Sequence, residues 1–349
     1  MTVDTLLLSP DKIDIAARII KNGGIVGMPT ETVYGLAASA YDPKAVADIF
    51  IAKGRPQDNP LIVHIAELGT LTELCRDVPD SAYEIAKRFW PGPLTIVLKK
   101  KPVVPSCVTA GMDTVAVRFT AHPIAQELIR RSGLPIAAPS ANVSGYPSPT
   151  TAAHVMRDLS GRIDACIDGG SCLCGVESTV ISLVNEPRLL RPGSVTLEQL
   201  REVVPDIVVD KALRGEVKDD EKVSAPGMKY RHYAPSAPVV AVCGTPEASC
   251  RYILGVFGDE DLCIGYDECA DRFDGKRFVS FGTSSDKEAL AREIFSALRK
   301  ADCMSPKKIY VQCPDDSGVG LAVANRIKKA AGFNVVDADS VLSRSKSED

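Results

Sequence analysis

The sequence predicts an α/β protein in which a mixed, twisted sheet with helices is followed by a second, smaller α/β domain. Short runs rich in Val and Ile alternate with segments of helical periodicity from residue 11 to about 204, and the alternation returns after residue 238. Several runs follow one another without an intervening helix, which favours a mixed sheet. A chain of 349 residues also exceeds the usual limit of a single hydrophobic core.

Start and stop signals position the elements of the first domain. Asp42 precedes Pro43, and Gly54 follows the last periodic residue, so a capped helix is predicted over 43–53. Other helices are expected at 11–21, 81–90, 123–131, 151–159 and, capped by Thr196, at 196–203. Strands are expected at 24–28, 61–65, 94–98, 115–119, 135–138, 165–167 and 179–184.

The composition changes after residue 210. Residues 211–221 are charged and polar, and residues 222–238 hold three prolines and no acidic residue, which is typical of a linker. The later alternation predicts a Rossmann-like domain with strands at 239–242, 262–265, 308–311 and 334–336 and helices at 246–256, 287–301 and 320–331. We expect a first domain over 1–210, a linker or flap over 211–238, a small domain over 239–342 and a polar tail over 343–349.

Charge and composition exclude several classes of protein. A net charge of -4 and a pI near 5.7 lack the basic excess of a protein that coats nucleic acid. The first twelve residues do not resemble a signal peptide, and no apolar run approaches the ~20 residues of a membrane helix. Eleven cysteines without paired spacing and four scattered histidines predict reduced thiols, no metal site and a cytoplasmic location.

Two polar segments follow predicted strands. The segment PTETVYG (29–35) is either a strand-to-helix turn with capping threonines or a loop that binds a ligand. The segment APSANVSG (138–145) is either an Asn/Gly turn or a backbone cradle for an anion. Residues 175–179 and 190–193 show the same pattern of small and polar residues.

Three cations have both structural and functional interpretations. Lys53 and Arg55 flank Gly54 at a helix end, where they either complement the helix dipole or cradle phosphate from a short loop. Arg118 lies inside an apolar strand, so it either forms a structural ion pair or awaits a carboxylate.

The linker segment PGMKYRHYAP (226–235) is richer in aromatic and cationic residues than a spacer requires. It either packs across one domain or closes over a nucleotide as a flap. No phosphate-binding G-x-x-x-x-G-K-[ST] loop, kinase-type glycine loop or G-x-S-x-G motif is present, so any ATP site is built in another way.

In this order, these segments resemble the threonylcarbamoyl-AMP synthase family in its long form. The resemblance implies a YrdC-like mixed twisted sheet, a linker and a smaller C-terminal domain. It spans nearly the whole chain and is carried by PTETVYGL (29–36), KGRPQDNPLIVHI (53–65), WPGPLTIVL (90–98), TVAVRF (114–119), APSANVSG (138–145), ESTV (177–180), LRPG (190–193) and PGMKYRHYAP (226–235).

The resemblance implies a nucleotidyltransferase that condenses L-threonine, bicarbonate and ATP to threonylcarbamoyl-AMP and pyrophosphate. The adenylate supplies the threonylcarbamoyladenosine modification of tRNA through a separate tRNA threonylcarbamoyltransferase. Because a threonine carbamate attacks the α-phosphorus, no protein nucleophile is required, and catalysis rests on positioning and charge neutralisation. Mg²⁺ is expected to accompany ATP, bound mainly by its phosphates.

The resemblance also implies roles for individual residues. L-threonine would be held by Thr32, His64, Arg118, Ala138 and Ser178. ATP would be contacted by Lys53, Arg55, Asn59, Thr114, Ser140, Asn142, Ser148, Arg191 and Tyr230. Lys53 and Arg55 are the implied catalytic residues.

Two other classes of protein compete with this interpretation. YrdC-like domains have basic concave faces, so the main alternative is a noncatalytic RNA-binding module, with a weak RNA contact. A regulatory protein that only senses a nucleotide is the other alternative. The acidic chain has no aromatic and basic RNA motif, which argues against the first alternative. No membrane partner is expected.

Overall fold

The computed structural model describes residues 4–213 and 233–345. Residues 4–144 and 148–213 form one compact unit, and residues 145–147 and 233–345 form a second. Within these ranges no helix has the length and apolarity needed to cross a membrane. Because residues 214–232 lie outside the described ranges, the limits of the linker stay predictions.

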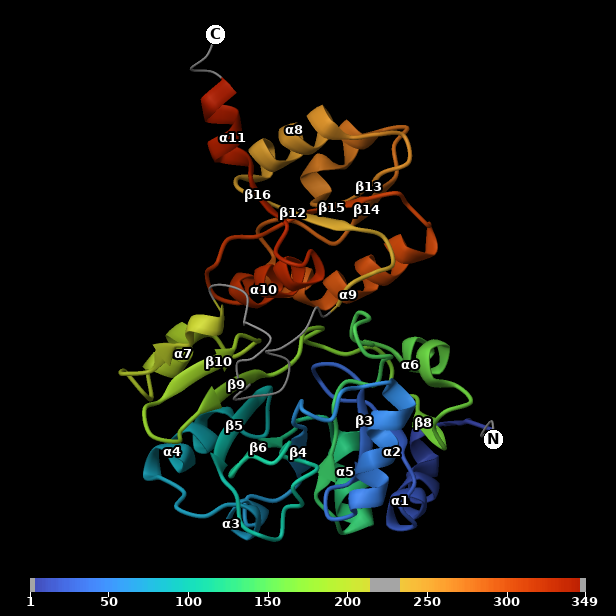
Figure 1. Cartoon of the computed structure of the whole chain (residues 1–349), viewed down its shortest axis with the longest axis vertical. Coiled ribbons are helices and arrows are strands. Elements are labelled where there is room, and N and C mark those ends of the chain that lie inside the picture. Colours follow the sequence, from blue (N-terminus) through green and yellow to red (C-terminus); the bar gives the residue numbers. More distant parts are fainter. Residues whose placement is uncertain (1–3, 214–232, 346–349) are drawn as a thin grey trace. The chain divides into compact units, whose positions relative to one another are not determined.

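The first unit is built on a mixed sheet, as predicted (Figure 1). Its described strands lie in the order β1-β8-β2-β3-β7-β4-β6-β5-β9-β10-β11. β4 pairs in parallel with β6, whereas β5 pairs antiparallel with β6. The strands are β1 (Leu6–Leu8), β2 (Val26–Met28), β3 (Gly35–Ser39), β4 (Ile62–Ile65), β5 (Leu94–Lys99), β6 (Thr114–Phe119), β7 (Ile136–Ala137), β8 (Ala165–Ile167), β9 (Thr179–Ser182), β10 (Arg188–Arg191) and β11 (Val208–Val209).

The predicted helix caps are present in the structure. The Asp42 side chain accepts hydrogen bonds from two backbone N–H groups at the start of α2, and Gly54 ends this helix with φ 60°. Thr196 forms a capping box with Gln199. The helices of this unit are η1 (Pro10–Lys12), α1 (Ile13–Lys21), α2 (Pro43–Lys53), α3 (Thr70–Leu74), α4 (Asp80–Phe89), α5 (Pro123–Ser132), α6 (Ala152–Leu159), α7 (Leu197–Arg201) and η2 (Lys211–Leu213).

Strand β3 corrects the expectation of a turn that leads into a helix after residues 29–35. It pairs antiparallel with β2 and is buried along its whole length. Leu36 and Ala38 pack in one hydrophobic cluster and Ala37 packs in another, so the strand has a core on both faces. Its small residues carry little β-propensity, and the sheet on either side decides its conformation.

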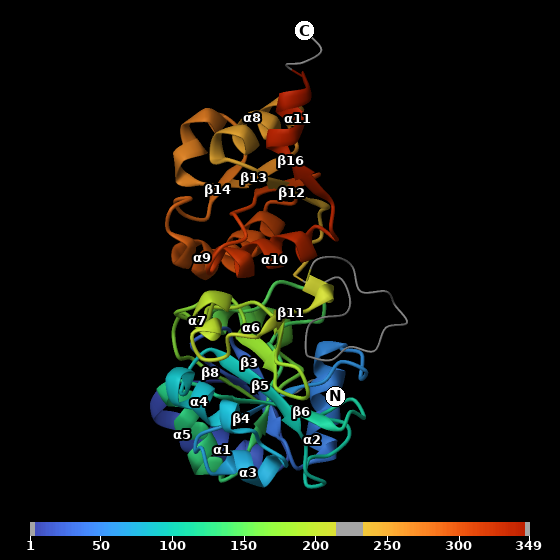
Figure 2. The same ribbon diagram turned by 90° about the vertical axis from the view of Figure 1, so that its left-hand side faces the viewer.

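The second unit is a parallel sheet with helices on both faces, which confirms the predicted alternation. Its strands lie in the order β14-β13-β15-β12-β16. They are β12 (Val239–Cys243), β13 (Leu262–Gly265), β14 (Phe278–Ser280), β15 (Ile309–Gln312) and β16 (Val335–Asp337). The helices are α8 (Pro246–Val256), η3 (Asp267–Phe273), α9 (Lys287–Cys303), α10 (Gly320–Ala330) and α11 (Ala338–Ser345). Helices α9 and α10 pack together on one face, and α8, η3 and α11 pack on the other (Figures 1 and 2).

The end of the predicted flap is anchored in the second unit. Tyr233 is buried, and its ring centroid lies 5.1 Å from that of Phe295. The guanidinium of Arg326 lies 5.8 Å from the centroid of the Tyr233 ring. Tyr233 therefore contributes to the core of this unit, whereas residues 226–232 of the same motif lie outside the described residues.

Candidate active site

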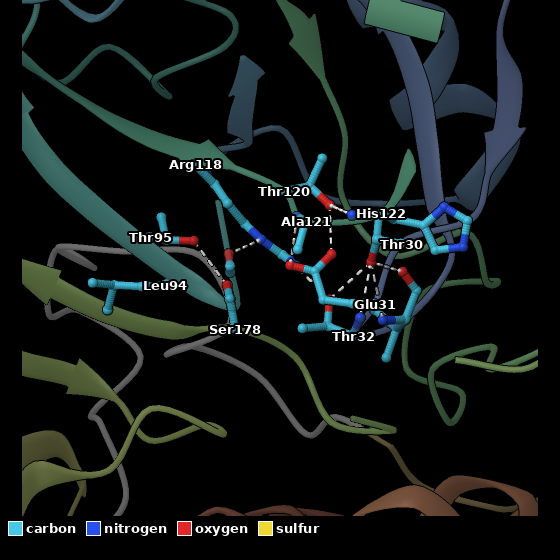
Figure 3. A network of polar contacts seen from close by, with 12 residues as sticks. Thr30, Glu31, Thr32, Leu94, Thr95, Arg118, Thr120, Ala121, His122 and Ser178 are labelled. Carbon is cyan, nitrogen blue, oxygen red and sulfur yellow. Dashed lines mark hydrogen bonds and ion pairs between the residues drawn. The ribbon is translucent and has the colours of Figure 1, made fainter. Parts of the chain in front are cut away.

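The PTETVY segment forms the loop of the hairpin between β2 and β3. The Thr30 hydroxyl donates to the carbonyl of Val33 at 2.6 Å and shares a hydrogen bond of 2.9 Å with the hydroxyl of Thr32. It also accepts from the backbone N–H groups of Thr32 and Val33. This local network fixes the loop in a conformation that buries Glu31 and Thr32 in the protein (Figure 3).

Arg118 reaches this loop from β6. Its Nη2 lies 2.8 Å from Oε1 of Glu31, and the two side chains are only 4% and 7% exposed. Nη1 donates to Oγ1 of Thr32 at 2.8 Å, and Nε donates to the carbonyl of Gly92 at 3.3 Å. The structural ion pair considered for Arg118 is therefore present (Figure 3).

The ion pair leaves donors on Arg118 for a further acceptor. A guanidinium carries five N–H groups, and the contacts above use one on each nitrogen. The contact between Nη2 and Glu31 also lacks hydrogen-bond alignment. Among the described residues, each terminal nitrogen thus keeps at least one N–H for an incoming acceptor. Two such donors suit a carboxylate.

Glu31 is the anionic partner that stabilises the buried guanidinium. Burial alone would raise its pKa, but the charge of Arg118 and the hydrogen bonds from the Thr120 hydroxyl and the Ala121 N–H lower the pKa to about 2. Glu31 is therefore ionised at neutral pH and is not suited to act as a general base. Its role at this position is electrostatic.

His64 lies on β4, directly across from Arg118 on β6. Burial and the positive charge of Arg118 lower its pKa to about 3, although Glu31 acts in the opposite direction. The ring is neutral at physiological pH and forms a hydrogen bond with the backbone of Ala138. Its buried Nδ1 has no hydrogen-bond partner among the described residues. A buried polar atom without a partner is expected to face a ligand or a water.

Ser178 joins this cluster through β5. Its hydroxyl shares a hydrogen bond of 2.8 Å with that of Thr95, which pairs with Arg118 in the sheet register. Arg191 donates from Nε to the Ser178 carbonyl and from Nη2 to its hydroxyl, both at 3.0 Å. Gly193 permits this approach, because a Cβ there would lie 2.3 Å from the backbone nitrogen of Thr179.

Lys53 corrects the expectation of a cation on a loop. It is the last residue of α2 and is buried, and its ammonium donates to the carbonyls of Ser140 and Asn142, both at 2.5 Å. The carbonyl of Lys53 accepts from the N–H of Ser144. Lys53 therefore holds the predicted anion cradle of residues 138–145 in place, in addition to any contact with phosphate.

The other predicted residues are joined to this cluster to different degrees. The hydroxyl of Ser148 donates to Glu177 at 2.5 Å, next to Ser178. Arg55 donates to the carbonyl of Asn59, at the end of the same loop. Thr114 begins β6, four positions before Arg118 on the same strand, and pairs in register with Lys99 of β5. Tyr230 lies outside the described residues.

Sequence reasoning missed several members of this network, among them Glu31, Thr95, Thr120 and Glu177. The need of a buried arginine for a carboxylate was clear, but its partner is 87 positions away in the chain. The available signal was Glu31 itself, an acidic residue between two threonines in a segment adjoining apolar strands. Only the sheet order brings the two side chains together.

Two family profiles match successive parts of the chain. The family described as "Telomere recombination" matches residues 18–193. The family described as "Threonylcarbamoyl-AMP synthase, C-terminal domain" matches residues 195–332. The two matches together cover both units of the structure.

Proteins similar over nearly their whole length point to the same family. Threonylcarbamoyl-AMP synthase of Pyrococcus abyssi (strain GE5 / Orsay) is 48% identical over 93% of this chain and 95% of its own. That of Bacillus subtilis (strain 168) is 45% identical over 95% of this chain and 96% of its own. The crystal structure of P. abyssi Sua5 complexed with L-threonine matches with a TM-score of 0.89 at 46% identity, covering 95% of this chain and 99% of that one.

The fold and these relatives define an α/β enzyme of the nucleotidyltransferase type. The second, parallel unit distinguishes its long form from relatives that align with only about half of this chain. The chain belongs to the threonylcarbamoyl-AMP synthase family, in the long form of which Sua5 is an example.

Proposed function

We propose that this protein condenses L-threonine, bicarbonate and ATP to threonylcarbamoyl-AMP and pyrophosphate. The observation that supports this most directly is Arg118, a buried arginine with donors left for a carboxylate in a chain of this family. The threonine amine captures bicarbonate as a carbamate with loss of water. The carbamate oxygen then attacks the α-phosphorus of ATP and expels pyrophosphate.

Threonine is recognised by the cluster around Arg118. The two terminal nitrogens of Arg118 bind its carboxylate, and Thr32 orients the guanidinium. The Nδ1 of the neutral His64 accepts a hydrogen bond from a donor of the substrate. Ala138 and Ser178 complete the threonine site, and the P. abyssi relative solved with L-threonine supports this choice of substrate.

ATP lies against the adjoining loops in this proposal. Arg55 and Arg191 supply positive charge for the phosphates, and Lys53 keeps the 138–145 loop shaped for them. Positioning and charge neutralisation then lower the barrier to attack, because the site needs no protein nucleophile. The remaining ATP contacts come from Asn59, Thr114, Ser140, Asn142, Ser148 and Tyr230.

Mg²⁺ accompanies ATP in this proposal. In the described residues no three His, Cys, Asp or Glu side chains gather as metal ligands. Such a surface fits a Mg²⁺ ion that keeps its waters and is bound mainly by phosphate oxygens. Glu177 is buried and accepts a hydrogen bond from the Ser148 hydroxyl, one of the proposed ATP contacts. When bound, the ion neutralises phosphate charge.

The product is a reactive mixed anhydride, so a separate transferase is proposed to receive it and to carry the threonylcarbamoyl group to a tRNA adenosine. A weak contact of this protein with RNA is proposed only as an accessory to that transfer. The reaction is proposed to take place in the cytoplasm, where threonine, bicarbonate and ATP are available together.

The deciding experiment measures pyrophosphate release by the purified full-length protein. We expect release only when threonine, bicarbonate and ATP are all present, together with a threonylcarbamoyl-AMP peak in mass spectrometry. Serine, which lacks the β-methyl group, serves as a matched control substrate. Binding of RNA or ATP without pyrophosphate release would contradict the proposal and favour a noncatalytic RNA-binding or nucleotide-sensing protein.

A truncation at Lys222 tests the predicted flap. The first-domain fold should persist, because its described core ends before residue 210. We expect weaker ATP binding and slower turnover if residues 226–235 close over the nucleotide. Full activity of the truncated protein would show that the segment is only a tether.

A further inference from the structure

A cavity of about 520 Å³ opens at the carboxyl edge of the sheet in the second unit. It is lined by residues at the carboxyl ends of β12, β13 and β15, among them Cys243, Tyr266 and Cys313. The chain leaves β12 for α8 on one face of the sheet and leaves the neighbouring β15 for α10 on the other. The cavity thus lies at a topological switch point, the place where α/β sheets form their sites.

Two cysteines face each other in this cavity. Val242 of β12 pairs in register with Gln312 of β15, so Cys243 and Cys313 form the next pair along these parallel strands. Adjacent strands lie about 4.8 Å apart, and side chains at paired positions project to the same side. Such a spacing falls in the Cα range of about 4.4–6.8 Å that a disulfide spans. The two thiols lie close enough that each shifts the pKa of the other.

The two thiols differ in access and in acidity. Cys243 is half-buried, and the hydrogen bond from Cys313, aided by the charge of Lys328, lowers its pKa although burial opposes this. Cys313 is buried, and donating that hydrogen bond raises its pKa, as does burial. The accessible partner is therefore the better nucleophile, and the buried partner is positioned to react second.

A second thiol pair in the same unit provides a contrast. Cys250 of α8 and Cys269 of η3 also lie close enough for Cys269 to shift the pKa of Cys250, but both are buried and neither lines the cavity. Burial raises the pKa of Cys250 to about 12. Contact between thiols is common to the two pairs, whereas access from the cavity and an acidic first thiol belong to Cys243 and Cys313.

We propose that Cys243 and Cys313 form a redox-active dithiol whose co-reactants are small hydroperoxides entering the cavity of the second unit. The Cys243 thiolate attacks the outer peroxide oxygen, takes up that oxygen as a sulfenic acid and releases an alcohol, or water from hydrogen peroxide. The Cys313 thiol then attacks the sulfenic sulfur, which forms the disulfide and releases water. Two thiols and one hydroperoxide thus give one disulfide, one alcohol and one water.

The test treats the folded full-length protein with hydrogen peroxide, blocks the remaining thiols with N-ethylmaleimide and maps the peptides by mass spectrometry. We expect a linked peptide pair containing Cys243 and Cys313 that has lost two hydrogens, and reversal by dithiothreitol. Cys250 and Cys269 should stay reduced and serve as the internal control. A Cys250–Cys269 link without a Cys243–Cys313 link would overturn the proposal.

Single variants separate the two roles. In Cys313→Ser we expect a sulfenic acid on Cys243 that dimedone traps, and in Cys243→Ser we expect Cys313 to remain a thiol. Absence of a dimedone adduct in Cys313→Ser would contradict the role of Cys243, provided that circular dichroism shows a folded protein. These readouts do not depend on adenylate synthesis, so they stand or fall separately from the proposed function.

Discussion

The arginine cluster of the first unit and the dithiol cavity of the second differ in how far their ion pairs are buried. Arg118 and Glu31 pair while almost completely buried. Around the cavity, Lys287 pairs with Asp315 and Lys328 pairs with Asp316, with carboxylates that are 66% and 58% exposed. Loss of one partner from the buried pair is costly in stability, because water does not solvate the charge that remains. Loss of a partner from an exposed pair costs little, because water solvates the remaining charge.

Function constrains the two units in different ways. A small anionic substrate needs preorganised donors, and burying an arginine with one counter-ion provides them at a cost in desolvation. A thiol pair needs proximity, access and an acidic first thiol, and the carboxylates of the ion pairs near it remain largely exposed. The following experiments challenge or refine this contrast.

Removing the counter-ion should have the largest effect. Glu31→Ala leaves the Arg118 charge buried without its carboxylate, so we expect the free energy of unfolding to fall by about 3–5 kcal/mol. Urea denaturation measures this loss. Asp315→Ala, which breaks an exposed pair in the second unit, is the matched control. Similar small losses in both variants would show that the buried ion pair contributes no more to stability than the exposed one.

Lys53 tests whether a buried cation can be structural and functional at once. Lys53→Ala removes charge-assisted hydrogen bonds to the carbonyls of Ser140 and Asn142, so we expect a loss of about 2–3 kcal/mol in stability and weaker ATP binding. Thermal denaturation and calorimetric titration with ATP measure the two effects. Lys44→Ala, on the exposed start of α2, should change neither. An unchanged melting temperature in Lys53→Ala would show that its contacts are dispensable.

Arg118→Lys keeps the charge but not the two-pronged geometry. We expect kcat/KM for threonine to fall roughly thirtyfold, which corresponds to a loss of about 2 kcal/mol in transition-state stabilisation. ATP affinity should stay near that of the native protein. Steady-state pyrophosphate release at varied threonine concentration checks this. Lost ATP affinity with an unchanged threonine KM would show that Arg118 has been assigned to the wrong substrate.

Acidification should destabilise the first unit in two steps. The pKa of His64 in the folded protein is about 3, below its ordinary value of 6.5. Its contribution to stability is therefore complete above pH 6.5 and is lost as the pH falls toward 3. The contribution of Glu31 is complete above its ordinary pKa of 4.5 and is lost toward about 2. Between pH 6.5 and 4.5 we therefore assign the decline in the free energy of unfolding to histidine. For one proton, this decline is no more than about 1.4 kcal/mol per pH unit.

Urea denaturation across this pH range measures the slope. His64→Gln should flatten it, whereas His122→Gln, which removes a less buried histidine whose pKa burial also lowers, should flatten it less. Equal slopes in His64→Gln and the native protein would mean that His64 is not neutral and buried in solution.

Breaking a surface ion pair should have the smallest effect. Lys287→Ala removes the contacts to Asp315 and Ser317, and we expect a loss of no more than about 1 kcal/mol in stability. The effect should shrink further in high salt, because the Asp315 carboxylate is 66% exposed. A salt-independent loss as large as that of Glu31→Ala would show that the charges of the second unit are also structurally fixed.

Local chemistry in the sequence determined much of this protein. Asp42, Pro43 and Gly54 specify the ends of α2, because capping groups and a left-handed glycine act within one helical turn. The alternation after residue 238 predicted the parallel second unit. The order of polar motifs indicated the family and a nucleotidyltransferase, which the similar proteins support independently.

Tertiary structure alone decided which side chains meet. The small residues of β3 become a central strand because neighbouring strands pair with both of its edges. Glu31 meets Arg118, Lys53 turns inward to the 138–145 loop and Cys243 meets Cys313 only because the sheet orders place distant segments together. Propensity and capping act over a few residues, whereas ion pairs and thiol contacts depend on the order of distant strands, which no local pattern encodes.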